Sequence, residues 1–297
     1  MEFRYKSTYA HCLLCPRRCG ADRTSSHGVC GMSDELRIAR VGLHMWEEPC
    51  LSGKNGSGTI FFTGCNLGCI FCQNHRISTR ELPGRAFTVE ELAMAMLDLE
   101  KQGAHNINLV TGTHFVPHII EGVRLARKKG LTLPIVYNCG GYESVETLRM
   151  LEGTIDIYLP DMKFFSRELS RRLCHAEDYF EVSKEAVAEM FRQVPDQVFD
   201  SEGIMQKGVI VRHLMLPRQL FDTKHILDHL CETYGNRITI CLMNQYTPMP
   251  GVPEDLCKPL SSDHYRAMVD HLTILGQENA YTQEGGTVSE SFIPDFE

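Results

Sequence analysis

The sequence predicts an α/β fold built on a parallel sheet. After about residue 59, six short β-rich apolar runs alternate with six stretches of helical periodicity. Parallel strands need crossover connections of this kind. The chain has 297 residues, 43% of them apolar and 23% charged, which supplies a large core. Because right-handed crossovers build either an open barrel or a doubly wound sheet, periodicity leaves both architectures open.

The elements can be placed in order along the chain. Thr88 followed three residues later by Glu91 is a capping box, which begins the first helix, and Gly103 ends it. The other helices are predicted at 117–129, 144–151, 183–194, 223–234 and 262–275, and the strands at 59–62, 106–110, 134–138, 155–159, 209–214 and 238–242. In both architectures, functional groups collect in the loops that follow the carboxyl ends of the strands.

Charge and hydropathy exclude two classes of partner. There are 30 Lys and Arg residues against 38 Asp and Glu, a net charge of -8, which excludes a strongly basic nucleic-acid module. No apolar run approaches the roughly 18 residues that span a bilayer. The opening MEFRYKSTYAHC lacks the apolar region of a secretory signal. We expect a soluble cytoplasmic protein with neither a nucleic-acid nor a membrane partner.

Cysteine usage divides the chain into two predicted parts. Thirteen cysteines are many for a reducing compartment, where clustered cysteines more often bind metal than form disulfides. Residues 1–58 are loop-rich and end in the glycine-rich run SGKNGSG. We therefore predict a cysteine-rich, metal-binding extension over 1–58, followed by a core and C-terminal tail over 59–297.

The first cysteine group is C-x3-C-x2-C, formed by Cys65, Cys69 and Cys72 directly after the first predicted strand. Three thiolates on a four-iron cluster leave one iron open, and an open iron can bind a small molecule and pass it an electron. The alternatives are three free cysteines in the core or an incomplete zinc site. Gly64 and Gly68 would allow the tight backbone turns that such a loop needs.

The same loop resembles a known family. C-x3-C-x-aromatic-C, with Phe71 as the aromatic residue, is similar to the signature of the radical SAM superfamily. That resemblance implies an open (β/α)6 partial TIM barrel. It also implies a [4Fe-4S] cluster on the three cysteines, Phe71 beside the cofactor, and cleavage of S-adenosylmethionine (SAM) to methionine and a 5′-deoxyadenosyl radical. The radical would abstract a hydrogen atom from a substrate.

A wider resemblance covers most of the chain. The runs CLLCPRRCGADR, GSGTIFFTGCNLGCIFCQNHRIS and FIPDFE resemble the PflX family, relatives of pyruvate formate-lyase activating enzymes. This implies a low-potential electron donor, such as flavodoxin or ferredoxin, and as first candidate substrate the backbone glycine of a glycyl radical enzyme. Two alternatives stay open: a small molecule or protein side chain as substrate, and an iron-sulfur electron-transfer protein without SAM turnover.

The resemblance also implies SAM contacts in the loops after the second and third strands. Activating enzymes place a Gly-Gly-Glu segment where this chain has Thr111, Gly112, Thr113 and His114, so the loop corresponds but the acidic group does not. The alternative is a strand-to-helix turn capped by Thr113. After the third strand, Asn138 is placed to bond ribose or carboxylate.

Later strands supply further expected contacts. Asp161-Met162-Lys163 resembles the Asp-x-Lys of activating enzymes, in which the lysine lies near the SAM carboxylate and the aspartate near a cation. A cation at Asp161 is doubtful here, since Asn138 is neutral. Arg212 can fork onto a carboxylate, with an ordinary ion pair as the alternative. Gln245 falls where activating enzymes contact adenine or ribose.

The second cysteine group has the spacing C-x2-C-x3-C-x10-C. It supplies four thiols, the number that closes either a zinc tetrahedron or an auxiliary [4Fe-4S] cluster, and an unligated group is the alternative. Its members are Cys12, Cys15, Cys19 and Cys30. Among the scattered cysteines, Cys139 lies nearest the expected active face and is the candidate reactive thiol. No other catalytic residue can be assigned.

Overall fold

A mostly parallel sheet organises the chain. The computed structural model describes residues 6–283. The spatial order of the strands along the sheet is β10 (Ala280–Thr282), β9 (Thr239–Met243), β8 (Met205–Leu214), β6 (Ile157–Pro160), β5 (Ile135–Cys139), β4 (Ile107–Val110), β2 (Ser57–Phe62), β1 (Arg37–His44) and β3 (Arg85–Ala86). A further short strand, β7 (Val198–Phe199), pairs antiparallel with β8.

Strand order decides between the two architectures that periodicity left open. From β2 to β10 the neighbouring strands are parallel, and their order in space follows their order in the chain, apart from the β7 excursion. A doubly wound sheet would reverse direction at a switch point. Within residues 6–283, the outermost strands β3 and β10 do not pair, so the sheet is not closed. The predicted α/β class and open, partial barrel are confirmed.

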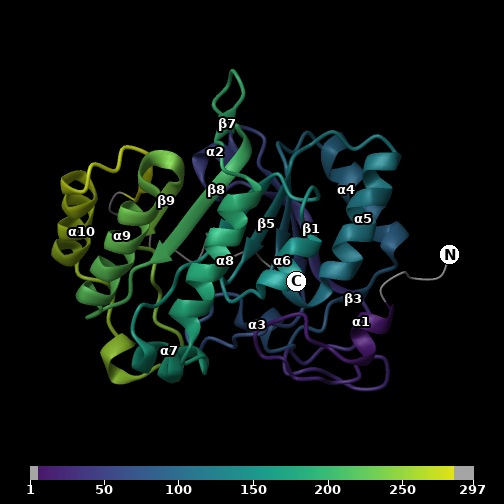
Figure 1. Cartoon of the computed structure of the whole chain (residues 1–297), viewed down its shortest axis with the longest axis horizontal. Coiled ribbons are helices and arrows are strands. Elements are labelled where there is room, and N and C mark those ends of the chain that lie inside the picture. The colour runs from purple at the N-terminus through teal and green to yellow at the C-terminus, as the bar shows by residue number, and fades with distance from the viewer. Residues whose placement is uncertain (1–5, 284–297) are drawn as a thin grey trace.

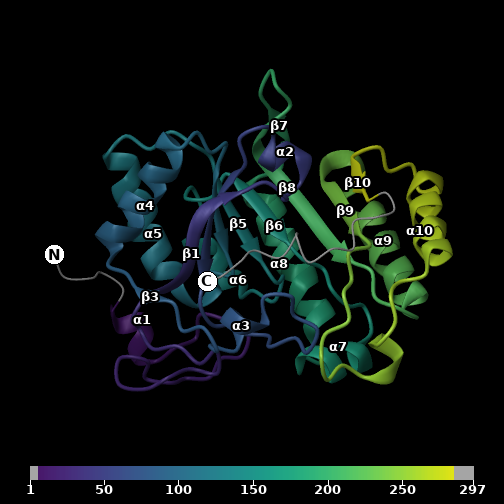
Figure 2. The ribbon, with the colours of Figure 1, turned by 180° about the vertical axis from the view of Figure 1, so that it is seen from behind.

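The long helices lie on one side of the sheet (Figure 1). Figure 2, the view from behind, shows strands β1, β5, β6 and β8 in front of them. The capping box is present: Thr88 accepts from the Glu91 backbone, and Glu91 bonds back to Thr88. The helices on this side of the sheet are α4 (Val89–Lys101), α5 (Val116–Lys128), α6 (Val145–Met150), α8 (Tyr179–Gln193), α9 (Leu220–Tyr234) and α10 (Ser262–Ile274). Each matches a predicted helix.

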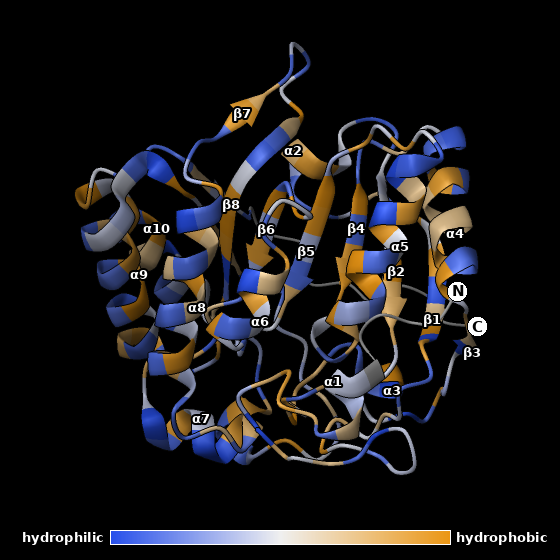
Figure 3. Ribbon diagram, turned by 45° about the vertical axis from the view of Figure 1, so that its right-hand side comes forward, coloured by the Kyte–Doolittle hydropathy of each residue, from blue (hydrophilic) through white to orange (hydrophobic). Residues whose placement is uncertain are grey.

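Strands in the centre of the sheet are buried throughout. Every residue of β2, β4, β5 and β6 is buried, the pattern expected of parallel strands covered on both faces. Figure 3 shows the hydrophobic residues concentrated on these strands and on the helix sides that face them. The apolar runs identified in the sequence therefore supply most of the core, with Thr59 and Asn108 as buried polar residues within it.

The N-terminal extension contributes a strand that periodicity did not predict. β1 runs antiparallel to β2, with Ile38 opposite Phe62 and His44 opposite Ser57. Most of β1 is only half-buried, so its sequence carries little apolar alternation. β2 begins at Ser57, inside the predicted extension. The cysteine-bearing segment before β1 lies beside the short helix α3 (His75–Ser78), at the edge of the sheet where the parallel strands end (Figure 1).

Other differences from prediction are local. β8 starts at Met205, four residues early, because a turn at 200–204 pairs it with β7. α8 starts at Tyr179, also early. The FIPDFE segment, 292–297, lies outside the described residues. Helical elements not predicted are α1 (Lys6–Ala10), α2 (Pro49–Ser52), α3 (His75–Ser78), η1 (Thr113–Phe115), α7 (Arg167–Cys174), η2 (Gly235–Arg237) and η3 (Glu254–Leu256).

Gly141, in the loop after β5, gives a test of how tightly the loops pack. Its φ is +75°, and a Cβ there would lie 2.0 Å from the carbonyl oxygen of Asp161. Gly153 has a similar φ of +76° with open space around it. We expect Gly153→Ala to cost about 1–2 kcal/mol of unfolding free energy from backbone strain alone. Gly141→Ala should cost about 2 kcal/mol more from the clash. Urea denaturation measures both, and equal losses would contradict the packing described.

Candidate active site

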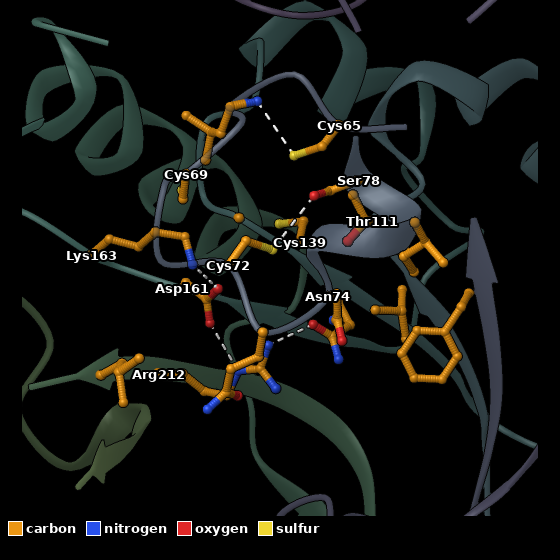
Figure 4. A pocket seen from close by; sticks show the side chains of 18 of the residues that line it. Cys65, Cys69, Cys72, Asn74, Ser78, Thr111, Cys139, Asp161, Lys163 and Arg212 are labelled. Atoms are coloured by element: carbon orange, nitrogen blue, oxygen red, sulfur yellow. Dashed lines mark hydrogen bonds and ion pairs between the residues drawn. The ribbon is translucent and has the colours of Figure 1, made fainter. Parts of the chain in front are cut away.

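The loop after β2 presents three thiols to one cavity. Cys65, Cys69 and Cys72 are each partly exposed, and Figure 4 shows their sulfurs around a common space. Gly64 and Gly68 have φ of +86° and +66°, the left-handed conformation that lets the loop turn back on itself. This placement matches the expectation that the three cysteines act together.

Hydrogen-bond donors already face two of these sulfurs. The backbone N–H of Leu67 donates to Cys65 Sγ at 3.3 Å, and the hydroxyl of Ser78 donates to Cys72 Sγ at 3.7 Å. Sulfur accepts such bonds best as a thiolate, the form that binds a metal. Burial raises the pKa of Cys72 to about 12, helped by the neighbouring Cys69 and Cys65. Without a metal the Cys72 thiol therefore stays protonated. The hydrogen-bond donors from Leu67 and Ser78 suit thiolates, which are the form that a metal would bind.

The cavity extends from the cysteine loop across the ends of the parallel strands. Its volume is about 220 Å³. Of the residues expected around the cofactor, those that line it are Phe71, Thr111, Asn138, Asp161, Lys163, Arg212 and Gln245. They lie near the carboxyl end of β5 and β8 or follow β2, β4, β6 and β9, so every parallel strand from β2 to β9 contributes at its carboxyl end. The rule for parallel sheets predicted this convergence.

A partly buried charge network forms one wall. Arg212 Nε donates to Asp161 Oδ1 at 2.9 Å, and Arg212 Nη2 donates to Asn138 Oδ1 at 2.7 Å. Lys163 Nζ donates to the other Asp161 oxygen. Arg212 Nη1 also lies 3.4 Å from a carboxylate oxygen of Glu47. Arg212 is thus in a partly buried network with several partners and not in the ordinary surface ion pair considered as the alternative.

The network keeps its members charged. Burial opposes ionisation, yet Lys163 and Arg212 outweigh it and lower the pKa of Asp161. Burial likewise opposes the charge on Lys163, but Asp161 and Cys69 raise its pKa above the ordinary value. The cavity wall therefore presents a fixed carboxylate between two fixed cations at neutral pH, an arrangement suited to a ligand with both amino and carboxylate groups.

Two other residues are held by backbone or ring contacts. Thr111 has φ of +61°, unusual for a β-branched residue, and its N–H donates to the Asn138 carbonyl at 2.8 Å. Phe71 packs edge-on against Phe164 and at a tilt against Tyr246, with ring centroids 6.0 and 6.4 Å apart. Such strained or clamped positions are typical of binding sites.

Three residues expected around SAM do not line the cavity. Gly112 faces the core, where a Cβ would lie 2.4 Å from Ile119. Thr113 donates to Glu143 at 2.7 Å instead of capping the turn, and the His114 ring bonds the Thr63 carbonyl at 2.7 Å. The chain turns into η1 at Thr113, so these side chains point inward. Of the four-residue loop, only Thr111 reaches the cavity.

Cys139 lines the cavity but is 2% exposed. Burial and the neighbouring Glu143 raise its pKa well above the ordinary value. A thiol in this setting is protonated, so it is poorly suited to act as a thiolate nucleophile. Its part in the chemistry, if it has one, would be as a neutral S–H group.

The N-terminal extension supplies residues that sequence reasoning missed. The segment after β1 puts His44, Trp46 and Glu47 into the cavity wall. Glu48, beside them, is buried, and one of its carboxylate oxygens has no hydrogen-bond partner. The sequence did contain a signal for this part of the cavity wall. The only tryptophan of the chain stands next to two glutamates, in a segment that was predicted to be loop. Only the pairing of β1 with β2 shows that this segment lies at the cavity.

The second cysteine group also gathers in space. Cys12, Cys15 and Cys30 are buried and Cys19 is partly exposed. As they stand, no three His, Cys, Asp or Glu side chains within residues 6–283 are arranged to enclose a single metal ion.

Comparison with known proteins identifies relatives. A family model described as the Radical SAM superfamily matches residues 59–208. An uncharacterized protein of Methanocaldococcus jannaschii is 30% identical over 249 residues, which cover 82% of this chain and 68% of that protein.

Solved structures share the fold. Methylornithine synthase (PylB) aligns with a TM-score of 0.51 at 17% identity, over 73% of this chain and 68% of its own. Native anSMEcpe with bound AdoMet aligns with a TM-score of 0.51 at 13% identity, over 74% of this chain and 61% of its own. Among the described helices, none is both long and apolar enough to cross a membrane.

Glu143, behind the cavity wall, should give stability a distinctive pH dependence. Burial raises its pKa from 4.5 to about 7, despite hydrogen bonds from Thr113 and Tyr137. The folded state therefore holds a proton that the unfolded chain releases above pH 4.5. Stability from this group is present below pH 4.5 and is lost as pH rises through 7.

We expect this loss to be about 3 kcal/mol in the wild type and absent in Glu143→Gln. Urea denaturation at several pH values measures it. Glu146→Gln, at an exposed carboxylate three residues away, is the control and should keep the wild-type slope. An unchanged pH dependence in Glu143→Gln would refute the assignment.

Proposed function

We propose, from the premise that this chain belongs to the radical SAM superfamily, that its cavity is where SAM is cleaved and a substrate hydrogen is abstracted. Members of the superfamily are enzymes that cleave SAM with an iron-sulfur cluster. One observation carries the assignment of the site. The three thiols of the loop after β2 line the same cavity as the partly buried network of Asp161, Lys163 and Arg212.

The three thiols would hold a [4Fe-4S] cluster and leave one iron for SAM. When bound, the cluster supplies one electron to split SAM into methionine and a 5′-deoxyadenosyl radical. The donors from Leu67 and Ser78 would stabilise the thiolate ligands. Phe71, fixed by Phe164 and Tyr246, would cover one side of the cofactor and exclude water.

The charged wall would orient the amino-acid end of SAM. Lys163 offers a permanent ammonium to a carboxylate, and Asp161 offers its carboxylate to an amino group. Arg212 is locked onto Asp161 and Asn138, so its main effect would be to keep Asp161 ionised and in place. Thr111 and Gln245 would face the nucleoside end, since they line the cavity outside this network.

For the substrate, we propose first the backbone glycine of a glycyl radical enzyme. The motif resemblance to activating enzymes supports it. So does the rim of the cavity, where Trp46 is 58% exposed beside the exposed Met45. Large amphipathic and soft side chains at a rim suit contact with a protein surface. A small molecule or another protein side chain is the second candidate, because methylornithine synthase shares the fold.

Two further partners are part of the proposal. A low-potential donor of the flavodoxin or ferredoxin class would supply the electron. A second metal, zinc or a [4Fe-4S] cluster, would be held by the four cysteines of the extension. Electron transfer without SAM turnover is the least favoured alternative, because a carrier usually has a fully ligated cluster.

Removing one cluster ligand should abolish SAM cleavage. Anaerobically reconstituted enzyme with SAM and dithionite should form 5′-deoxyadenosine, and Cys69→Ala should form at least about 100-fold less. The reason is that losing a residue that only supports a metal ligand already lowers metal affinity or activity about 10–100-fold, and Cys69 is a predicted direct ligand. Cys257→Ala, at an exposed cysteine away from the cavity, is the matched control. Iron is counted in all samples, and turnover by Cys69→Ala at the wild-type rate would refute the site.

The substrate class is tested by electron paramagnetic resonance. Candidate glycyl radical enzymes are incubated with the reduced enzyme and SAM, and the partner is expected to acquire a stable glycine-centred doublet. Replacing the partner's glycine with alanine should remove that signal. If 5′-deoxyadenosine forms while no partner acquires a protein radical, the glycyl radical hypothesis fails and the small-molecule candidate takes its place.

A further inference from the structure

Two sulfurs of the N-terminal cysteine group approach one point in the fold. Those of Cys19 and Cys30 lie 3.5 and 3.4 Å from one point, the position of a Cβ on Gly28. Three of the sulfurs are each faced by the backbone N–H of the residue two positions later in the chain. Arg17 faces Cys15, Ala21 faces Cys19, and Met32 faces Cys30. This repeats the Leu67-to-Cys65 bond of the active-site loop.

Arg23 is a buried cation beside this group. Its exposed fraction is 0%. It donates to the carbonyls of Met32, Ser33 and His114, and its Nη1 lies 3.6 Å from Cys12 Sγ. It also lies over the rings of Tyr9 and Phe115, at 4.7 and 5.6 Å from their centroids. No ion pair joins it to a carboxylate among residues 6–283, so its partners carry no full negative charge. A buried guanidinium needs a counter-charge, and four metal-bound thiolates would supply one.

Arg17 connects the group to the active-site loop. It follows Cys15 by two residues, and its Nε donates to the carbonyl of Asn66, the neighbour of Cys65, at 2.8 Å. Its Nη2 donates to the carbonyl of Cys174 at 2.9 Å. One side chain thus joins the extension both to the cysteine loop and to the end of α7.

A second contact joins the same two loops. A Cβ on Gly64 would lie 2.5 Å from Met32 and 3.0 Å from the Cys30 carbonyl, so the two backbones are in direct contact. Residues on both sides of Cys65 therefore rest on the segment that carries the second cysteine group. A change in that segment must be felt at the active-site loop.

We propose that Cys12, Cys15, Cys19 and Cys30 bind a metal as an anionic tetrathiolate centre whose charge Arg23 partly balances, and that Arg17 links this centre to the Cys65 loop and positions that loop. The positioning role rests on the proposed cluster site at Cys65, whereas the metal centre does not. Zn²⁺ and a [4Fe-4S]²⁺ core give the same dianion with four thiolates, so the charge argument holds for both. The metal content distinguishes them.

The first experiment isolates the centre. The full chain with Cys65, Cys69 and Cys72 all changed to Ala is reconstituted anaerobically with iron, sulfide and zinc. We expect about one zinc or about four irons per chain to remain, with Mössbauer spectra identifying a cluster. A further Cys15→Ser change should remove that metal. A triple variant that binds no metal overturns the proposal, and this outcome is independent of whether the wild type cleaves SAM.

The second experiment tests neutralisation by Arg23. We expect Arg23→Gln to lose metal to a chelator about tenfold faster than wild type, because the variant lacks the positive charge beside the thiolates. Arg23→Lys should recover most of the difference, because lysine restores that charge. Circular dichroism checks that both variants are folded. Equal rates in wild type and Arg23→Gln would overturn the role of Arg23.

The third experiment tests positioning by Arg17. Hydrogen exchange of the peptide covering 63–75 should be about tenfold faster in Arg17→Gln, since a partly buried charge-assisted hydrogen bond to Asn66 is lost. The N-terminal metal should be retained. Arg18→Gln is the matched control, because the adjacent Arg18 is exposed. If exchange in Arg17→Gln matches that of Arg18→Gln, the link between the two sites is rejected.

Discussion

Parallel strands that share one sheet must all end at the same edge, and this constraint organises the molecule. Six strands from β2 to β9 are buried against each other and against the helices, so their side chains are committed to packing. Chemistry is left to the loops at that edge. There the loop after β2 brings the thiols, while the ends of β6 and β8 bring Asp161 and Arg212 together across 51 residues of sequence.

The charged wall depends on that geometry. Asp161 stays ionised because Lys163 and Arg212 are held against it, although burial alone would neutralise it. Holding two cations beside one carboxylate requires the ends of β6 and β8 to be fixed relative to each other. A flexible loop would not keep them there, because the entropy of ordering long side chains would oppose the contacts.

Sequence reasoning predicted what depends on local pattern. The strands, the helices, the capping box at Thr88 and the cysteine loop follow from periodicity and spacing, and the structure has them within a few residues. It failed where side-chain direction depends on tertiary contacts. Thr113 and His114 were predicted to contact SAM because their loop follows a strand. In the structure η1 turns their side chains away from the cavity, toward Glu143 and the Thr63 carbonyl. Glu47 was missed because β1 pairing places it.

The position of Trp46 has a spectroscopic consequence. It is the single tryptophan of the chain, it lies on the cavity wall, and it is half open to solvent. Indole emission from this protein therefore arises at one place, beside the thiols. An iron-sulfur chromophore there would quench it by energy transfer, and a docked substrate would shift its wavelength. The molecule thus contains an intrinsic optical reporter, through which loading and occupancy of the cavity can be followed without a label.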